Sequence, residues 1–261
     1  MYDSLPKKDL EKYADRMFHM ISEDRIICTE IPRTDKSIIE RFKAISGLSS
    51  AVSDALDELG ISGAVPASEI KPIPGQRNVK AVGNIVTLRF VPERTTCTKG
   101  VDDNLRSKTA SRDVLALSSP GDIYVIDMDE MPISGCGGMA ASLAASYGIA
   151  GIVVDGGIRD VEEISELNMP TWSRHITPVT CKHRVEAISI NGAVVIGGVQ
   201  ANPGDLCVAD DTGICFIPNE LAERILEICE AAVEKERRLH SVMNSGGSVA
   251  DMLEVMPADK W

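Results

Sequence analysis

The stretch GDIYVIDMDEMPISGCGGMAASLAASYGIAGIVVDGGIRDVEE, residues 121–163, decides the fold. It begins with an apolar run at 123–126, passes through a glycine-containing turn, continues as an Ala-rich helical pattern at 139–147 and ends with a second apolar run at 149–154. Two short β-rich runs joined by a helix of about three turns predict a βαβ crossover. Its two strands are then parallel, and their carboxyl ends lie at one edge of the sheet, where ligands bind in such folds.

Two chemical groups meet at that edge. Gly135, Gly137 and Gly138 open a helix N-terminus, where free backbone N–H groups bind anions. Arg159 and Asp160 follow the second strand. A hard cation such as Mg²⁺ needs only one or two carboxylates besides waters and substrate oxygens. The sequence therefore predicts one site for an anion and a metal; the alternative is that Asp160 caps the next helix and Arg159 is a surface charge.

Composition limits the possible functions. The 261 residues hold 27 Lys and Arg against 39 Asp and Glu, a formal charge of −12, which argues against nucleic acid as a main partner. No apolar run approaches the roughly 20 residues of a membrane span, and the charged N-terminus lacks a signal-peptide pattern, so we expect a soluble cytoplasmic protein that binds no membrane.

The seven cysteines are an odd number at irregular spacing, without a Cys-x-x-Cys pair. This pattern favours reduced, mainly buried thiols over zinc or redox centres. Cys136 lies beside the predicted helix N-terminus, where a thiolate is stabilised, so a nucleophilic role is an alternative for it. No histidine is near it in the sequence.

The chain is expected to divide into an N-terminal helical extension (1–46), a main domain (47–240) and a tail (241–261). The extension is expected to form polar helices at 8–21 and 37–45. The domain begins with a helix, capped by Ser49 or Ser50, whose apolar face ends before Gly60, and a long strand follows at 79–91. A polar helix-like segment at 95–119 comes before the central unit.

After the central unit the pattern changes. Turn dipeptides separate four short strands, at 187–190, 193–196, 206–209 and 214–217, which predicts antiparallel β structure from residue 169 onward. A last amphipathic helix at 219–240, capped by Asn219, is followed by a short tail helix beyond Gly246 and Gly247.

Other chemistries fit less well. Gly135-x-Gly137-x-x-Ala140, with Asp155 about 20 residues on, matches a loose dinucleotide-binding pattern. However, residues 128–134 separate the strand from these glycines, and the later chain lacks repeated βα units; an adenosyl methyl donor at a similar loop has the same weakness. Imine-forming aldol chemistry needs a desolvated lysine, and only Lys80 opens a strand.

A further group of polar residues, Asp102, Asp103 and Asn104, stands near the start of the segment 95–119. Short side-chain oxygens in a row are possible ligands or outer-shell groups of a metal site. Asp and Asn at a helix start are more often caps, and we expect that role for them.

The spacing of Gly138, then 20 residues, Arg159-Asp160, two residues and Glu163 resembles the G-x20-R-D-x2-E/D signature of the RraA-like superfamily. This superfamily includes the 4-hydroxy-4-methyl-2-oxoglutarate/4-carboxy-4-hydroxy-2-oxoadipate aldolases. The likeness runs from about residue 48 to about residue 236. It includes the segments Val52-Ser53-Asp54-Ala55-Leu56, Pro120-Gly121-Asp122, Gly197-Gly198-Val199, Pro203-Gly204-Asp205 and Asp210-Asp211-Thr212-Gly213.

The resemblance implies an α/β domain of the swivelling β/β/α type, with a βαβ core and an antiparallel part. It implies homotrimers or dimers of trimers, that is homohexamers, with sites between subunits. It also implies a class II aldolase that uses Mg²⁺ or Mn²⁺ to cleave a 4-hydroxy-2-oxo acid to pyruvate and a second oxo compound, with oxaloacetate decarboxylation as a side activity.

The resemblance also assigns residues. Arg159 is expected to bind the reacting oxygens and Asp160 to be the direct metal ligand. The best-known aldolases have an acid where this chain has Gly138, and Glu163, one helical turn past Asp160, is the expected substitute that holds a water. The substrate carboxylate is expected to bind backbone amides of Gly137, Gly138, Met139 and Ala140.

The general base is the open assignment. We expect a metal-ordered water held by Glu163; Glu234 or Glu236 of a neighbouring subunit are alternatives, and His175 is expected to be a polar strand-end residue. A second function class is a non-enzymatic regulatory trimer that binds RNA-processing proteins, which needs only the fold and a surface. The founding regulator lacks the complete R-D-x2-E ending, so Glu163 favours the enzyme.

Overall fold

The computed structural model describes residues 9–257. Residues 1–8 and 258–261, which belong to the expected extension and tail, lie outside the described residues. The central crossover has the predicted form: β4 (Ile123–Asp127), α5 (Gly138–Ser146) and β6 (Gly151–Ile158), with β4 and β6 parallel. Both strands are buried along their whole length, as expected of parallel strands that are covered on both faces.

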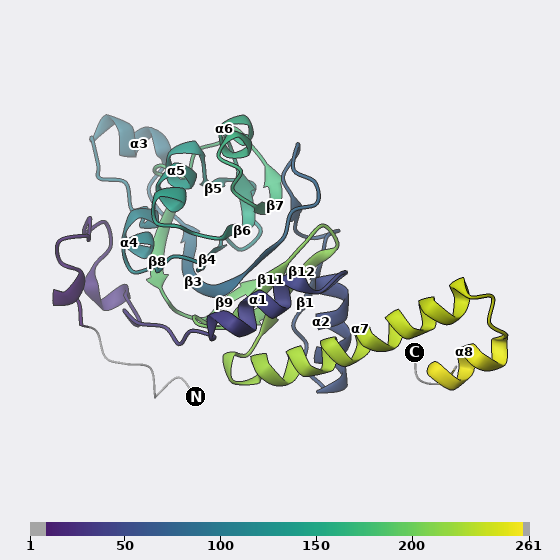
Figure 1. The fold of residues 1–261 in the computed structure, drawn as a ribbon. Coiled ribbons are helices and arrows are strands. Elements are labelled where there is room, and N and C mark those ends of the chain that lie inside the picture. The colour runs from purple at the N-terminus through teal and green to yellow at the C-terminus, as the bar shows by residue number, and fades with distance from the viewer. Residues whose placement is uncertain (1–8, 258–261) are drawn as a thin grey trace.

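These strands belong to a ten-stranded mixed sheet in the order β1-β12-β11-β3-β4-β6-β7-β2, with β5 beside β6 and β8 beside β3 (Figure 1). The strands β3, β4, β6 and β7 form its parallel centre, and antiparallel strands extend it on both sides. The expected α/β fold with an antiparallel part is therefore confirmed. The remaining strands are β1 (Ala64–Pro66), β2 (Lys71–Pro72), β3 (Ala81–Pro92), β5 (Ser134–Cys136), β7 (Thr171–Ile176), β8 (Val185–Ile190), β11 (Leu206–Ala209) and β12 (Gly213–Ile217).

The prediction that the chain becomes antiparallel from residue 169 onward is wrong for its first strand. β7 pairs with β6 in parallel, across the six-residue helix α6 (Val161–Glu166). So short a helix carries too little apolar periodicity to be recognised in the sequence. β6 also continues through its two glycines to Ile158, so Arg159 follows the strand directly.

Helices and a hairpin cover the sheet. On one face α4 (Ser111–Ala116) and α5 pack over Tyr124 and Ile126 of β4. On the other face a hairpin of β9 (Val194–Ile196) and β10 (Val199–Ala201) packs over Val125 and Trp172. A third cluster joins α1 (Lys36–Ala44), α2 (Leu48–Glu58) and α7 (Ala222–Asn244) to β11 and β12.

The polar segment 95–119 forms two short helices, α3 (Cys97–Asp102) and α4, instead of one. Asp102 and Asp103 lie at the end of α3, so the expectation that they cap a helix start is wrong. The Asp103 carboxylate is 2.6 Å from the Lys99 ammonium, four residues earlier, and Asn104 leaves the helix with a φ of 48°. This acidic group is therefore an ordinary helix end.

The N-terminal extension contains α1 as expected, but no α-helix forms in the described part of 8–21. The segment instead has the 3-10 turn η2 (Glu11–Tyr13), a second turn, η3 (Glu23–Arg25), follows it, and the chain passes beside α4 (Figure 1). Its backbone N–H groups find partners outside the segment: Phe18, Met20 and Ile21 all donate to the buried Asp113 carboxylate. These tertiary hydrogen bonds replace the helical ones.

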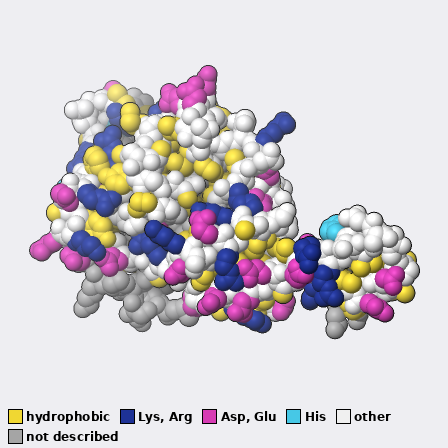
Figure 2. All heavy atoms as spheres, viewed as in Figure 1, with side chains coloured by type: hydrophobic (Ala, Val, Ile, Leu, Met, Phe, Trp, Pro, Cys, Tyr) yellow, Lys and Arg dark blue, Asp and Glu magenta, His cyan; other side chains and the backbone are white. Residues whose placement is uncertain are grey.

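The C-terminal helix leaves the body of the protein. A 3-10 turn, η4 (Asn219–Leu221), precedes α7, and the Asn219 amide donates to Thr34 Oγ1 and Gly204 O instead of capping the helix. The tail helix is present as α8 (Val249–Val255). Together the end of α7 and α8 form a separate lobe (Figures 1 and 2). Within residues 9–257, the structure contains no helix whose length and apolar character would let it cross a membrane.

One carboxylate fastens α2 to the sheet, which gives a stability prediction. Asp210 accepts hydrogen bonds from Ser49 N at 2.9 Å, Ser49 Oγ at 2.6 Å and Thr212 N at 2.8 Å. Asp210→Ala leaves the two buried Ser49 donors and the Thr212 N–H without this acceptor and is expected to lower the free energy of unfolding by about 3 kcal/mol in urea titrations. The control Asp57→Ala, at an exposed position of α2, should change it by less than about 0.5 kcal/mol. Equal losses in both variants would contradict the prediction.

Candidate active site

The site begins where β6 ends. Asp160 occupies the N-cap position of α6 with a φ of 56°, and its side chain makes no cap hydrogen bond to that helix. Instead, Asp160 Oδ2 accepts the Gly138 N–H of α5 at 3.0 Å. A left-handed conformation costs a non-glycine residue on the order of 1 kcal/mol, and Asp is one of the residues that adopt it most readily. The turn therefore directs a carboxylate across to the neighbouring helix.

Arg159 stands beside this carboxylate. Its Nε is 3.2 Å from Asp160 Oδ2, and its backbone N–H donates to Cys136 O at 3.2 Å, which ties the turn to β5. The Arg159 and Asp160 side chains are 43% and 34% exposed. Because the two donors approach Oδ2, the other oxygen of Asp160 remains accessible to a cation.

Two glycines make room for these side chains. A Cβ atom at Gly137 would lie 2.7 Å from Asp160 Oδ2 and 2.9 Å from Arg159 Nε. A Cβ atom at Gly138 would overlap the Glu163 carboxylate. The Glu163 carboxyl group thus occupies the space into which a side chain at position 138 would project. Arg159, Asp160 and Glu163 are therefore brought together around the start of α5.

The start of α5 offers backbone donors. The first N–H groups of a helix have no carbonyl partner within it. Of the four amides expected to hold an anion, that of Gly138 is already bound to Asp160, whereas Met139 and Ala140 follow in the first turn with the N–H direction that favours anions. The extended backbone of Gly137 leads into the helix.

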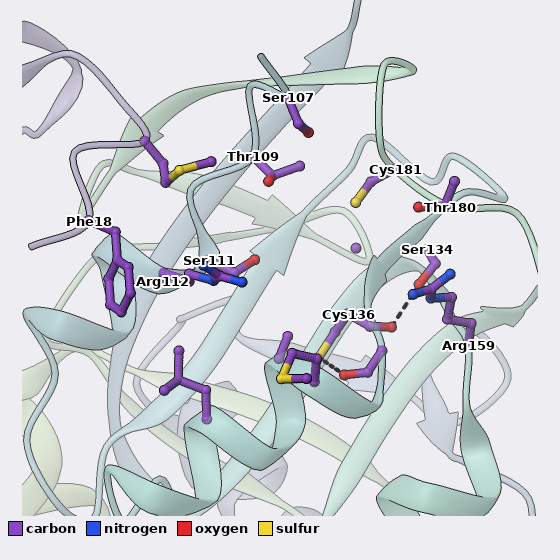
Figure 3. A pocket seen from close by; sticks show the side chains of 16 residues that line it. Phe18, Ser107, Thr109, Ser111, Arg112, Ser134, Cys136, Arg159, Thr180 and Cys181 are labelled. Carbon is purple, nitrogen blue, oxygen red and sulfur yellow. Dashed lines mark hydrogen bonds between the residues drawn. The ribbon is translucent and has the colours of Figure 1, made fainter. Parts of the chain in front are cut away.

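A cavity of about 520 Å³ opens beside these residues. Arg159 enters it from one side, and residues of the N-terminal extension and α4 close the opposite side (Figure 3). Hydroxyl and thiol groups supply much of the polar wall. The lining consists of Phe18, Met20, Ser107, Thr109, Ser111, Arg112, Ser134, Gly135, Cys136, Gly137, Met139, Ala140, Leu143, Arg159, Thr180 and Cys181.

The two cysteines of the cavity do not suit nucleophilic chemistry. Burial raises the pKa of the Cys136 thiol to about 12 and also raises the pKa of Cys181. Both are therefore protonated at neutral pH, and a thiol is a weak nucleophile. All seven cysteines are free; apart from Cys97 and Cys181 they are buried, which agrees with the expected reduced thiols.

Lys80 and Asp155, which imine-forming and dinucleotide-binding chemistry would use, do not line the cavity. Lys80 Nζ donates to Ile45 O at 2.7 Å, and the cavity within residues 9–257 has no lysine in its lining. The Asp155 carboxylate is bound by Arg174 Nε at 2.6 Å and is not free to hold a ribose. His175 Nε2 contacts a backbone carbonyl at 3.0 Å and does not line the cavity.

Glu234 and Glu236 lie on α7, outside the cavity of their own chain. The Glu234 carboxylate forms an exposed ion pair with Arg237 at 2.8 Å. Their role toward a neighbouring subunit stays a prediction.

The oxygen donors present suit a cation that keeps most of its water. Within the described residues, no group of three His, Cys, Asp or Glu side chains converges on one point. Zinc sites with three or four protein ligands therefore do not fit here. Asp160, with Glu163 across Gly138, supplies the one or two carboxylates that Mg²⁺ and Mn²⁺ need when waters and substrate oxygens fill the other positions.

Several lining residues carry no sequence signal of their role. Arg112 and Ser111 stand in the polar segment before the central unit, Phe18 is in the N-terminal extension and Thr180 follows β7. No motif or spacing links these segments to Arg159. Only the tertiary fold brings them to one cavity, so residue patterns within the sequence do not identify them.

The chain resembles known proteins over most of its length. The family model RraA-like (Aldolase/RraA) matches residues 49–216. A Halalkalibacterium halodurans protein named "Putative 4-hydroxy-4-methyl-2-oxoglutarate aldolase" is 31% identical over 220 residues, which are 84% of this chain and 94% of that protein. The protein DlpA of Legionella pneumophila is 29% identical over 207 residues, 79% of this chain, but the match spans only 32% of DlpA.

A solved structure shares the fold. The crystal structure of Streptomyces coelicolor RraAS2, described as an unusual member of the RNase ES inhibitor RraA protein family, has a TM-score of 0.66 and 31% identity, and covers 82% of this chain and 98% of that one. The family model covers more than half of the chain, including every residue from β4 to the start of β12. The chain therefore belongs to the RraA-like (Aldolase/RraA) family.

Proposed function

We propose that this protein is a divalent-metal-dependent aldolase that cleaves a 4-hydroxy-2-oxo acid, such as 4-hydroxy-4-methyl-2-oxoglutarate, to pyruvate and a second oxo compound. Oxaloacetate decarboxylation is the proposed side activity. The observation that carries the proposal is the placement of the Glu163 carboxylate in the space above Gly138, beside Asp160 and Arg159. The name of the Halalkalibacterium relative supports the reaction class.

Each residue has a task in this reaction. The free amides at the start of α5 bind the substrate carboxylate, and Arg159 binds the reacting oxygens. Glu163 takes the proton of the C4 hydroxyl through a water as the C3–C4 bond breaks. The electron pair of that bond stays on the pyruvate half as an enolate. Protonation of the enolate at C3 then gives pyruvate. Mg²⁺ or Mn²⁺ at Asp160, when bound, supplies positive charge for the developing oxyanion.

The fixed charge of Arg159 serves the same step. Its guanidinium is paired with Asp160, and its backbone N–H is bound to Cys136 O, so the charge is positioned before the reaction begins. Removing one such preorganised donor typically raises the barrier by about 3 to 4 kcal/mol.

A regulatory protein is the alternative function, because Streptomyces RraAS2 is described as a member of a family of RNase inhibitors. A regulator that acts through its surface requires no carboxylate at Asp160 or Glu163. Absence of any measurable pyruvate release by the wild-type protein, together with binding of RNA-processing proteins that an Asp160 variant retains, would favour it.

Metal dependence is the first test of the enzyme. EDTA should abolish pyruvate release and Mg²⁺ or Mn²⁺ should restore it, because no lysine is available for an imine route in the described cavity. Asp160→Ala should abolish both turnover and Mn²⁺ binding measured by calorimetry, whereas Asp103→Ala, in an exposed ion pair, should change neither. Full activity in EDTA, or a substrate adduct trapped by borohydride, would refute the mechanism.

The position of the second carboxylate gives another prediction. Glu163→Ala should reduce turnover strongly but lower metal affinity by no more than about tenfold. Loss of an outer-shell group, which does not bind the metal directly, typically lowers metal affinity or activity by about 10- to 100-fold. Adding Gly138→Asp to Glu163→Ala returns an acid to the same space and should recover about tenfold or more in kcat, within that same outer-shell range. Gly138→Ala alone should displace the flexible Glu163 carboxylate and lower kcat without lowering the melting temperature.

Normal turnover of Glu163→Ala would show that the base lies elsewhere, with Glu234 and Glu236 as the next candidates. If Glu163→Ala abolishes turnover and the added Gly138→Asp does not restore it, the proposal that an acid in this space serves the reaction is contradicted.

We further propose that copies of the chain assemble as a trimer or a dimer of trimers. Apolar side chains lie exposed near the site, with Met139 at 75%, Ile176 at 49% and Val179 at 37%. Light scattering at micromolar concentration should give a mass that is three or six times that of one chain. Ile176→Asp should lower that mass, whereas Val101→Asp, exposed on α3, should not. A monomeric wild-type protein would contradict the proposal.

A further inference from the structure

The cavity has a second guanidinium on the side away from Arg159. Arg112, at the start of α4, lines the cavity, and Figure 3 shows it across from Arg159. No acidic side chain of residues 9–257 lines the cavity beside Arg112. The ring of Phe18 is its neighbour, with the guanidinium carbon 5.4 Å from the ring centroid. A cation that faces a cavity without a carboxylate partner is suited to an anionic ligand.

Phe18 is fixed by the residue next to Arg112. The Asp113 carboxylate is fully buried and accepts the backbone N–H of Phe18 at 2.7 Å, that of Met20 at 2.6 Å and that of Ile21 at 3.3 Å. Bonds from one charged acceptor to three backbone donors hold the segment firmly against α4. The first turn of α4 therefore holds the cavity wall formed by Phe18 and Met20, and it also carries the Arg112 guanidinium.

A second contact holds the same wall. Arg106 Nη2 donates to His19 O at 2.7 Å, and His19 has a φ of 52°. This sharp bend between Phe18 and Met20 lets both side chains line the cavity. The wall therefore has a defined shape, although the segment lacks an α-helix.

Arg112 and Arg159 both line this cavity, and Figure 3 shows them on opposite sides of it. The wall there carries hydroxyls of Ser107, Thr109 and Ser111, and no acidic side chain of the described residues lines the cavity. A guanidinium binds a carboxylate through two parallel N–H donors, and the Phe18 ring restricts the orientations of the Arg112 guanidinium.

We propose that Arg112, held against Phe18, binds the carboxylate at the end of the substrate distant from Arg159. The site then selects 2-oxo dicarboxylates over monocarboxylates of equal length. This inference rests on the proposed function for the orientation of the substrate, with the 2-oxo acid end at Arg159. Arg112 and Phe18 are the specificity-determining residues, and Asp113 is a positioning residue that acts through the wall.

Calorimetry on the full chain with Mg²⁺ present tests this without turnover. The two ligands are 2-oxoglutarate and 2-oxopentanoate, which have the same length and differ by one carboxylate. The wild-type protein should bind 2-oxoglutarate about 10- to 100-fold more tightly, the range expected of hydrogen bonds to a charged group. Arg112→Met should bring 2-oxoglutarate down to the affinity of 2-oxopentanoate and leave the latter unchanged.

Two further variants sharpen the result. Phe18→Ala should reduce the preference for 2-oxoglutarate by several-fold, because the guanidinium loses its restraint. Arg77→Met, which removes an arginine outside the cavity, should keep the wild-type preference. Melting temperatures of all variants should stay close to that of the wild type, because the side chains of Phe18, Arg77 and Arg112 lie outside the buried core.

Equal or absent binding of the two ligands by the wild-type protein would overturn the inference, as would a preference that survives Arg112→Met. The aldolase proposal fails by a different result. If 4-hydroxy-4-methyl-2-oxoglutarate yields no pyruvate but 2-oxoglutarate still binds through Arg112, the anion site stands and the reaction is wrong.

Discussion

The site depends on the bare backbone of Gly137 and Gly138. A side chain at Gly137 would collide with the Asp160 and Arg159 side chains, and one at Gly138 with the Glu163 carboxylate, so the glycines let these three side chains lie against the start of α5. The approach permits the hydrogen bond from Gly138 N–H to Asp160, and this bond with the neighbouring Arg159 offsets the left-handed backbone of Asp160. These contacts hold β6, the turn at Arg159 and Asp160, and α5 together, and this arrangement sets the positions of the polar groups in the site.

The sequence predicts the parts of the fold that are local. The β4-α5-β6 crossover is long, apolar and bounded by glycines, so its periodicity is clear. The same reasoning misses β7 and its short α6, and it predicts a helix at 8–21 where Asp113, far along the chain, satisfies the backbone instead. Arg159 and Asp160 are predicted because they follow one strand closely, and Glu163 is predicted only from the resemblance to the family signature. Arg112 and Phe18 are missed because nothing in the sequence joins their segments.

The cavity is lined by residues inside the family match and by residues outside it. The family match covers 49–216, which includes the sheet strands around the site and the residues around Gly138. Phe18 and Met20 lie outside this range, yet they face the same cavity. Of the two residues proposed to select the substrate, Arg112 lies within the family match and Phe18 outside it. A change at Phe18 or Met20 would alter the wall of the cavity without touching Arg159 or the start of α5.

Cationic groups in this cavity belong to a strongly acidic molecule, and Figure 2 shows acidic side chains distributed over the body and the C-terminal lobe. An incoming dianion is repelled by the net charge of −12 at long range and attracted by Arg112 and Arg159 only at short range. The Debye length is about 10 Å at 0.1 M ionic strength, so salt removes mainly the long-range repulsion. Association of an anionic substrate should therefore become faster, not slower, as ionic strength rises from very low values, the opposite of a protein that steers its ligand with a global field of opposite sign.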